Sequence, residues 1–261
     1  MRHSVIIILI TVISMLTVSC STTRVLQDGE YRLTKNKIEV SNDKEFNPSQ
    51  LSKYLKQNEG LAWSPFMIVY NWSDGSGSGW DRFLRRIGKA PVVYDPDMVD
   101  SSIENITNHL EYLGYYGSSV NSEISVKKKR VTVTYDVHLG SRFPISDITY
   151  VLPKRGEFRQ DFLRDTAELG ITKGDYLSEA ILETLSETSS ARMRNLGYFD
   201  FSKNNYFFEA DTLSIPDSAK LELIINEYTR NESSKDAEPI RRYYIGNVDI
   251  SYPKSLKIKE K

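Results

Sequence analysis

The feature that most restricts the fold is a strict alternation of apolar and polar residues in the middle of the chain. Every second residue is apolar from position 131 onward: Val131, Val133, Tyr135, Val137 and Leu139. Successive side chains of a β-strand point to opposite faces, so this pattern predicts a strand with one buried and one wet face. A weaker strand is predicted at residues 120–126, joined to the first through the basic residues 127–130.

Two helices and an earlier strand are predicted before this hairpin. Residues 38–40 alternate as in a strand, and Asn47 followed by Pro48 suits the start of a helix. A second helix has one apolar face, formed by residues spaced three or four apart: Val99, Ile103, Ile106, Leu110 and Leu113. Gly114 then ends it. The predicted order is strand, helix, helix, strand, strand.

The same order of elements recurs in the second half of the chain. Residues 143–150 are predicted to form a strand, residues 158–169 and 177–195 two helices, and residues 201–208 and 221–225 two strands. Repetition at this spacing indicates tandem copies of one small domain.

The repeat is also visible in the residues themselves. Leu-Gly-Tyr-Tyr at 113–116 matches Leu-Gly-Tyr-Phe at 196–199, at the same junction between helix and strand. The stretch 143–148 resembles 244–250, which is therefore predicted to be the first strand of a third copy.

These motifs resemble the POTRA domain. The resemblance implies an α+β fold of tandem β-α-α-β-β domains, each a three-stranded mixed sheet with two helices on one face. The stretches 20–33, 69–71 and 87–95 are further similar to the lipid-anchored BamA/TamA-type proteins of Bacteroidetes, or TamL-like proteins. Lys89 stands where that branch more usually has an acidic residue.

The expected domain boundaries follow from the repeat and the resemblance. They are 1–19 for a signal peptide, 20–29 for a lipidated tether, 30–140 for a first POTRA-like domain with an insertion at about 60–95, 141–230 for a second, and 241–261 for the start of a third. Family members continue into a membrane β-barrel, whose eight or more strands we do not expect in these residues.

The start of the chain predicts lipid attachment. An apolar run at residues 5–18 is short for a membrane-spanning helix and suits a signal peptide, and it leads to Cys20, the single cysteine. Residues 16–20 resemble a lipobox, although Thr17 stands where Leu is commoner. The alternative is an uncleaved anchor with an incidental cysteine. Ser21 agrees, by resemblance, with the outer membrane, and the periplasmic face is expected.

By resemblance, the domains are docking modules of outer membrane protein assembly or translocation. An exposed sheet edge can bind an extended polypeptide through main-chain hydrogen bonds. The family's exposed edge is its second strand, which makes Val120, Ile124, Phe201 and Phe208 the candidate residues. The implied partners are unfolded outer membrane proteins and a TamB-like, periplasm-spanning protein.

The aromatic insertion suggests an alternative function. Trp63, Trp72 and Trp80 flank a Gly/Ser-rich stretch at 74–79 and are a candidate platform for glycans or peptides on a freestanding lipoprotein. The same aromatic residues are also consistent with a flap that packs on the first domain.

Charge and residue spacing argue against other classes of function. With 34 Lys and Arg against 35 Asp and Glu, the net charge is −1, which speaks against nucleic-acid binding. The three histidines show no metal-ligand spacing, and no serine has a nucleophile context, so no metal, cofactor or enzymatic activity is expected. The basic run 127–130 fits a solvated turn better than contact with anionic headgroups.

Overall fold

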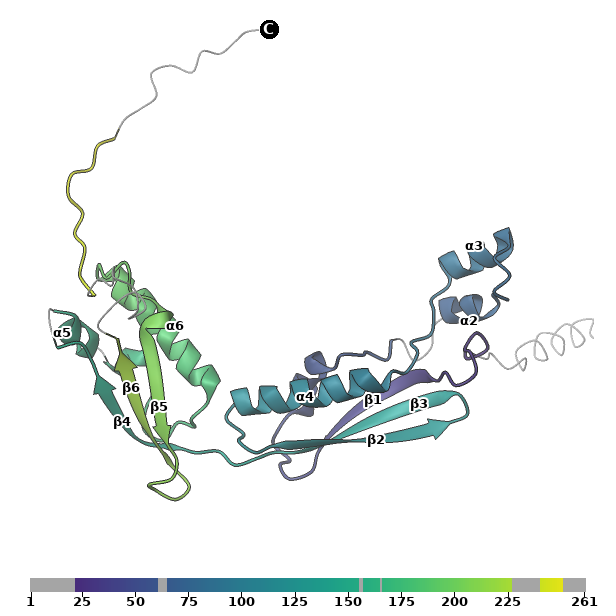
Figure 1. Cartoon of the computed structure of the whole chain (residues 1–261), viewed down its shortest axis with the longest axis horizontal. Helices are drawn as coiled ribbons and strands as arrows, with labels where there is room; N and C mark the ends of the chain where they lie inside the picture. Colours follow the sequence, from purple (N-terminus) through teal and green to yellow (C-terminus); the bar gives the residue numbers. More distant parts are fainter. Residues whose placement is uncertain (1–21, 61–64, 155–156, 165, 227–239, 251–261) are drawn as a thin grey trace, which may run out of the picture. The chain divides into compact units, whose positions relative to one another are not determined.

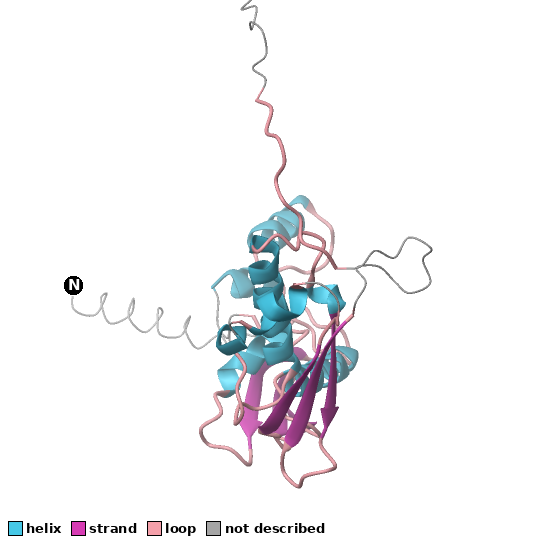
Figure 2. Ribbon diagram, turned by 90° about the vertical axis from the view of Figure 1, so that its left-hand side faces the viewer, coloured by secondary structure: helices cyan, strands magenta, loops and turns pink. Residues whose placement is uncertain are grey.

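The computed structural model describes residues 22–60, 65–154, 157–164, 166–226 and 240–250. The chain forms two compact units, which divide after Ser141 (Figure 1). Each unit contains a three-stranded mixed sheet with helices, and Figure 2 colours these strands and helices, so the predicted α+β class is confirmed. The predicted signal peptide and Cys20 lie outside the described residues.

The described residues of unit 1 form one sheet, three α-helices and a 3₁₀-helix. Its elements are β1 (Arg32–Val40), η1 (Pro48–Tyr54), α2 (Pro65–Asn71), α3 (Gly79–Ile87), α4 (Pro96–Tyr112), β2 (Ser119–Lys127) and β3 (Arg130–His138). The strand order is β1-β3-β2, with β1 parallel and β2 antiparallel to β3.

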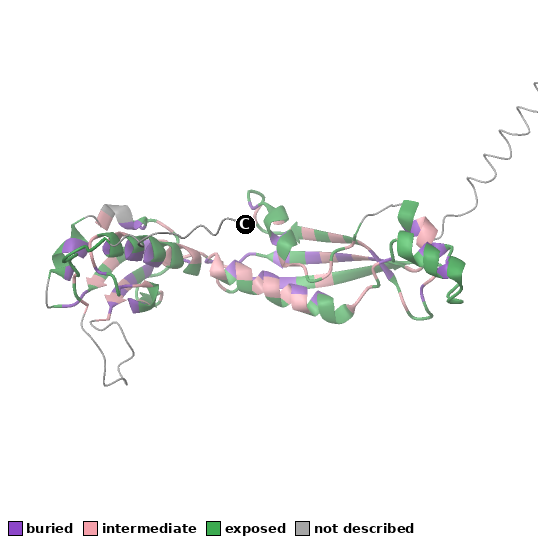
Figure 3. Ribbon diagram, turned by 90° about the horizontal axis from the view of Figure 1, so that it is seen from above, coloured by how far each residue is buried: buried purple, intermediate pink, exposed green. Residues whose placement is uncertain are grey.

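The central strand of unit 1 is the one that the alternation predicts. Its apolar residues Val131, Val133 and Val137 are fully buried and pack with the apolar stripe of α4, including Ile106 and Leu110. The polar residues between them lie on the opposite face of the sheet and stay partly or fully exposed. Figure 3 shows this alternation of buried and exposed positions along the strands. The sheet therefore has one face in the core and one in solvent.

Unit 2 repeats this arrangement. Its elements are β4 (Ile145–Val151), α5 (Phe158–Leu163), η2 (Thr166–Leu169), α6 (Glu179–Asn195), η3 (Lys203–Asn205), β5 (Tyr206–Asp211) and β6 (Ala219–Ile225). The order is β4-β6-β5, again parallel on one side of the central strand and antiparallel on the other.

The two units share the junction that follows their long helices. Gly114 and Gly197 both have positive φ, 85° and 100°, directly after α4 and α6. Glycine adopts this left-handed conformation without a Cβ penalty, so it reverses the chain at the end of a helix. In unit 2 the following Tyr198 is buried, and its ring packs edge-on against Phe158 at 5.1 Å.

Four predicted elements differ from the observed ones. The helix expected after Asn47 is a 3₁₀-helix, and the helix predicted at 158–169 is split into α5 and η2. The strand predicted from residue 201 begins at Tyr206, because a capping box between Ser202 and Asn205 first forms η3. Residues 240–250 have no regular secondary structure, although a strand was expected from 244.

Burial of a central-strand leucine should control the stability of unit 2. Leu223 in β6 is fully buried, whereas Leu213 in the loop after β5 is 94% exposed. We expect Leu223→Ala to lower the free energy of unfolding of unit 2 by about 2–5 kcal/mol, and Leu213→Ala to change it little. Urea denaturation followed by circular dichroism measures both, and equal effects would contradict the placement of these side chains.

Candidate functional site

One edge of the sheet in unit 1 is formed by β2. Within the described residues, β3 is the strand to which β2 pairs, from Ser119 opposite His138 to Lys127 opposite Arg130. In an edge strand, alternate N–H and C=O groups point away from the sheet. The nine residues of β2 therefore present a row of main-chain donors and acceptors.

Apolar side chains line this edge on the helix side. Val120 is buried next to α4, whereas Ile124 and Val126, on the same face, are 45% and 52% exposed. Their partners Val133 and Val131 are fully buried. Ile124 and Val126 thus form an exposed apolar ledge beside the core, which we call the β2 ledge. Both predicted edge residues of this unit, Val120 and Ile124, lie on β2.

The edge strand of unit 2 is β5, which pairs with β6. Phe208 lies on β5, as predicted, and stacks with Tyr206 at 6.0 Å. Placing Phe201 on this edge was wrong: it is 1% exposed, precedes η3 and packs against Phe158 at 5.0 Å. The β5 edge is shorter than β2, with six residues.

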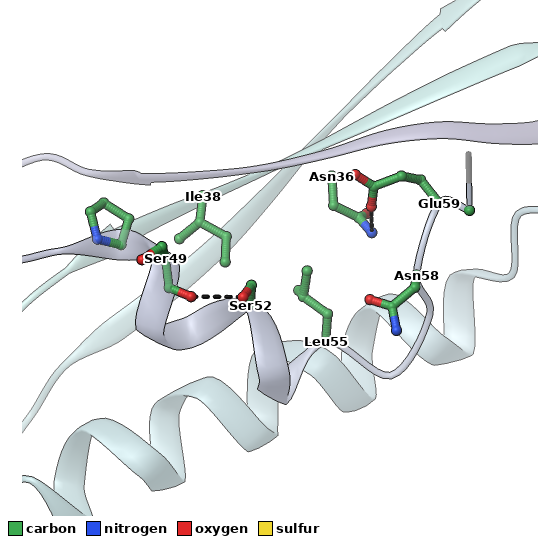
Figure 4. Close-up of a pocket in the computed structure, with 9 residues that line it drawn as sticks. Asn36, Ile38, Ser49, Ser52, Leu55, Asn58 and Glu59 are labelled. Atoms are coloured by element: carbon green, nitrogen blue, oxygen red, sulfur yellow. Dashed lines mark hydrogen bonds between the residues drawn. The ribbon is translucent and has the colours of Figure 1, made fainter. Parts of the chain in front are cut away.

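The outer side of β1 is partly covered by other segments of unit 1. Leu33 donates its N–H to Val92 O at 2.8 Å, and Tyr94 donates to Tyr31 O at 2.7 Å. Farther along β1, an open pocket of about 440 Å³ separates the strand from η1 (Figure 4). In it, Asn36 donates to Gln57 O at 2.8 Å, while its own side-chain oxygen is buried with no partner among the described residues.

The aromatic insertion folds into a helical hairpin organised by Asp81. This carboxylate is 3% exposed at the start of α3 and accepts the N–H groups of Gly75 and Gly77, both at 3.1 Å. Ser78 caps α3 by accepting the N–H of Asp81. Gly88 caps the end of α3 and lies so close to α2 that a Cβ there would be 2.6 Å from Tyr70 N, so glycine fits this position without movement of the main chain.

These contacts lower the pKa of Asp81 to about 2, first through a hydrogen bond from Ser73, then through Gly75, Gly77 and Arg85, against the cost of burial. The folded pKa lies below the ordinary value of 3.8, so the ionised form supports the hairpin at neutral pH. This support is lost as the pH falls from about 4 towards 2.

The hairpin is fastened to the first described residues of the chain. The side-chain oxygen of Asn71, at the end of α2, accepts the N–H groups of Arg24 at 2.9 Å and Val25 at 3.4 Å. Its amide donates to Met67 O at 2.8 Å, which fixes the side chain in place. Thr22 accepts a hydrogen bond from the buried guanidinium of Arg32. Residues 22–25 are thus held between β1 and the hairpin.

The predicted aromatic platform is only partly observable. Trp72 and Trp80 are 62% and 67% exposed, and Trp80 stacks on Phe83 with 5.4 Å between ring centroids. Trp63 lies outside the described residues. Asn71 and Asp81, which organise the hairpin, were not singled out from the sequence. The signal for Asp81 was Ser78 three residues earlier, the spacing of a capping box.

His109 packs against other side chains of unit 1. His109 stacks on Tyr54 with 3.9 Å between ring centroids, and burial, followed by the charge of Lys53, lowers its pKa. Over the described ranges, no group of three or more His, Cys, Asp or Glu side chains is placed to hold a metal ion. None of the described helices combines the length and apolar character needed to cross a membrane.

Comparison with known families concerns unit 1. Residues 34–140 match the family model POTRA, described as surface antigen variable number repeat. The matched segment, less than half of the chain, is thus similar to POTRA domains. The match runs from β1 to the end of β3, and unit 2 has the same strand order and pairing. No curated protein matches the sequence.

Solved structures similar to the chain include POTRA domains 3–5 of BamA from Haemophilus influenzae, at 11% identity and a TM-score of 0.38, covering 77% of this chain and 69% of that one. BamA from Haemophilus ducreyi lacking POTRA domains 1–3 has 15% identity and a TM-score of 0.38, covering 75% and 29%. POTRA domains 1–3 of Omp85 from Anabaena have 11% identity and a TM-score of 0.32, covering 74% and 61%. The chain thus spans less than a third of the Haemophilus ducreyi protein.

The role of Asp81 can be tested by removing its charge. We expect Asp81→Asn to speed hydrogen exchange at the Gly75 and Gly77 amides, because a neutral amide oxygen is a weaker acceptor than a carboxylate. Asp100→Asn, an exposed change on α4, should leave both amides unaffected. NMR-detected exchange measures both variants, and unchanged protection of Gly75 and Gly77 in Asp81→Asn would contradict this role.

Proposed function

We propose that this chain is a periplasmic docking module of a system that assembles or translocates outer membrane proteins. It binds extended polypeptide by strand addition to β2. The observation that carries the proposal is the nine-residue β2 edge of a POTRA-like domain, with the β2 ledge exposed beside its main chain.

The physics of strand addition fits this edge. An added strand gains hydrogen bonds from main-chain groups, which every polypeptide possesses, so affinity places little demand on sequence. Side chains of the added strand that point to the helix side would cover Ile124 and Val126 and remove their apolar surface from water. Those that point to the other side would meet the polar face of β2, including Glu123 and Lys127.

The preferred ligand is therefore a strand with alternating apolar and polar residues. Transmembrane β-strands of outer membrane proteins have this pattern over about 9–11 residues. β2 has nine residues, so one such strand matches its length. By family resemblance, a TamB-like, periplasm-spanning protein is a further proposed partner for the same edge.

We further propose that a lipid on Cys20 holds the module at the periplasmic face of the outer membrane. The sequence supports this through the apolar run at 5–18, which ends beside the single cysteine. The described chain adds that residues 22–25 pack against unit 1, so the domain begins two residues after the proposed lipid.

Strand addition predicts crosslinks from the β2 ledge. A benzoylphenylalanine at Ile124 should form adducts with a synthetic peptide of alternating valine and threonine, made as long as β2. The same photoreactive residue at Met98, an exposed position on α4, should form few. Mass spectrometry identifies the adducts, and equal yields from both positions would sink the proposal.

Charging the ledge gives a second readout. The double variant Ile124→Asp and Val126→Asp should weaken binding of this peptide by about tenfold or more, because the added strand then packs against carboxylates. Fluorescence polarisation of the labelled peptide measures the loss. Leu213→Asp, at an exposed position of unit 2, is the matched control and should leave the affinity unchanged.

Lipid attachment is tested independently of peptide binding. In cells that express the full chain, radiolabelled palmitate should be incorporated into the protein, and Cys20→Ala should abolish the label. Ser21→Ala serves as the control that retains the label. Incorporation that persists in Cys20→Ala would contradict the proposed anchor.

A further inference from the structure

We propose that the exposed side of the α2–α3 hairpin rests on an anionic lipid surface and orients unit 1 against the membrane. The contact is made by Trp72, Trp80, Phe83 and Ile87, with Arg82 and Arg86 beside them. This inference builds on the proposed lipid anchor at Cys20, and it assigns the aromatic insertion a lipid partner.

The first support is that large apolar side chains of α3 are exposed. Trp80, Phe83 and Ile87 are three and four residues apart, so they share one face of the helix, and all three are exposed. Leu84 lies between Trp80 and Ile87 on this face but is buried against the hairpin, as is Asp81. The apolar face of a surface helix normally packs on its own domain. In α3, a stripe of large apolar side chains instead faces outward.

The charge beside this stripe suits an anionic surface. Between residues 65 and 90 there are four Lys or Arg and two acidic residues. One of the two, Asp81, is already occupied by Arg85 at 3.3 Å and by main-chain N–H groups. Arg82 and Arg86, one turn apart, are exposed. Tryptophan and cationic residues together are typical of helices that lie in a membrane interface.

The second support is the position of the hairpin relative to the anchor. Asn71 holds the main chain of Arg24 and Val25 against α2, and Arg32 holds Thr22. Only Ser21 lies between Cys20 and Thr22, and an extended chain spans at most about 7 Å over these two residue steps. A lipid on Cys20 would therefore bring the hairpin to the membrane surface without any movement within unit 1.

The turn between β2 and β3 adds charge at the same end of unit 1 (Figure 1). The amine of Lys129 donates to Leu26 O at 3.2 Å and to Gln27 O at 3.1 Å, which fixes the turn next to the tether. Lys127 and Lys128 stay exposed there. The basic run 127–130 thus lies beside the proposed contact, whereas the sequence alone favoured a solvated turn.

Stacking within the hairpin favours a lipid over a sugar as its partner. A sugar ring binds flat against an open aromatic face, and Phe83 already stacks on one face of Trp80. The stacked pair is instead exposed as one apolar surface, with Trp80 67% and Phe83 47% exposed. Amphipathic aromatic rings take this position at membrane interfaces.

Tryptophan fluorescence in the full chain tests the proposal. With Trp63→Phe and Trp72→Phe, Trp80 becomes the single reporter. The protein is reconstituted with vesicles of phosphatidylglycerol and phosphatidylethanolamine that carry brominated acyl chains. We expect blue-shifted Trp80 emission and strong quenching. Arg82→Glu with Arg86→Glu should reverse most of both effects.

A second reporter gives the matched control. Lys44→Trp, in a chain with all three native tryptophans changed to Phe, lies after β1, about 26 Å along the strand from the tether. It should remain unquenched on the same vesicles. Quenching of both reporters to the same degree would overturn the proposed orientation.

The remaining outcomes separate this inference from the lipid anchor. If Cys20 carries lipid and Trp80 stays in water, the membrane contact is overturned and the anchor stands. If Cys20 carries no lipid and Trp80 is still quenched, the contact stands and the anchor fails. Equal quenching on phosphatidylcholine would overturn the role of charge. A shift of Trp80 with a glycan array or peptide, and none with vesicles, would overturn the lipid assignment.

Discussion

The pairing of a central strand with one parallel and one antiparallel neighbour governs both units. β3 and β6 each receive hydrogen bonds on both sides, and their alternating side chains supply much of the core beneath the helices. Because three strands leave two edges, the same pairing creates the exposed main chain of β2. The candidate site is thus a direct result of how the core is closed, and its apolar ledge continues the buried row of Val131 and Val133.

Much of this arrangement could be predicted from the sequence, because its signals are periodic. The alternation from Val131 identified β3, and the spacing of Val99 to Leu110 identified α4. The recurring Leu-Gly-Tyr motif showed that a second copy follows, since glycine at the end of a long helix has a specific conformational role. The resemblance to POTRA domains then supplied the mixed three-stranded sheet and the second strand as its exposed edge, which periodicity alone does not contain.

The remaining features depend on interactions that a periodic pattern does not report. Phenylalanine is common in strands, so Phe201 was predicted to lie in one. A capping box between Ser202 and Asn205 instead forms η3, and β5 begins only at Tyr206. The α2–α3 hairpin depends on a single buried carboxylate and on Asn71, a side chain that binds a segment more than forty residues earlier. Such long-range polar contacts become visible only when the chain is folded, and they determine where the exposed tryptophans lie.

The parallel pairing of β1 with β3 also affects the order in which the parts of unit 1 can fold. Arg32 pairs with Arg130, so closing the sheet of unit 1 joins segments roughly a hundred residues apart, which is entropically costly and slow. The contacts of the α2–α3 hairpin lie within the first ninety residues: Asp81 accepts from Gly75 and Gly77, and Asn71 accepts from Arg24 and Val25. During synthesis, which begins at the N-terminus, the α2–α3 hairpin can therefore form before β3, the partner of β1, has been made.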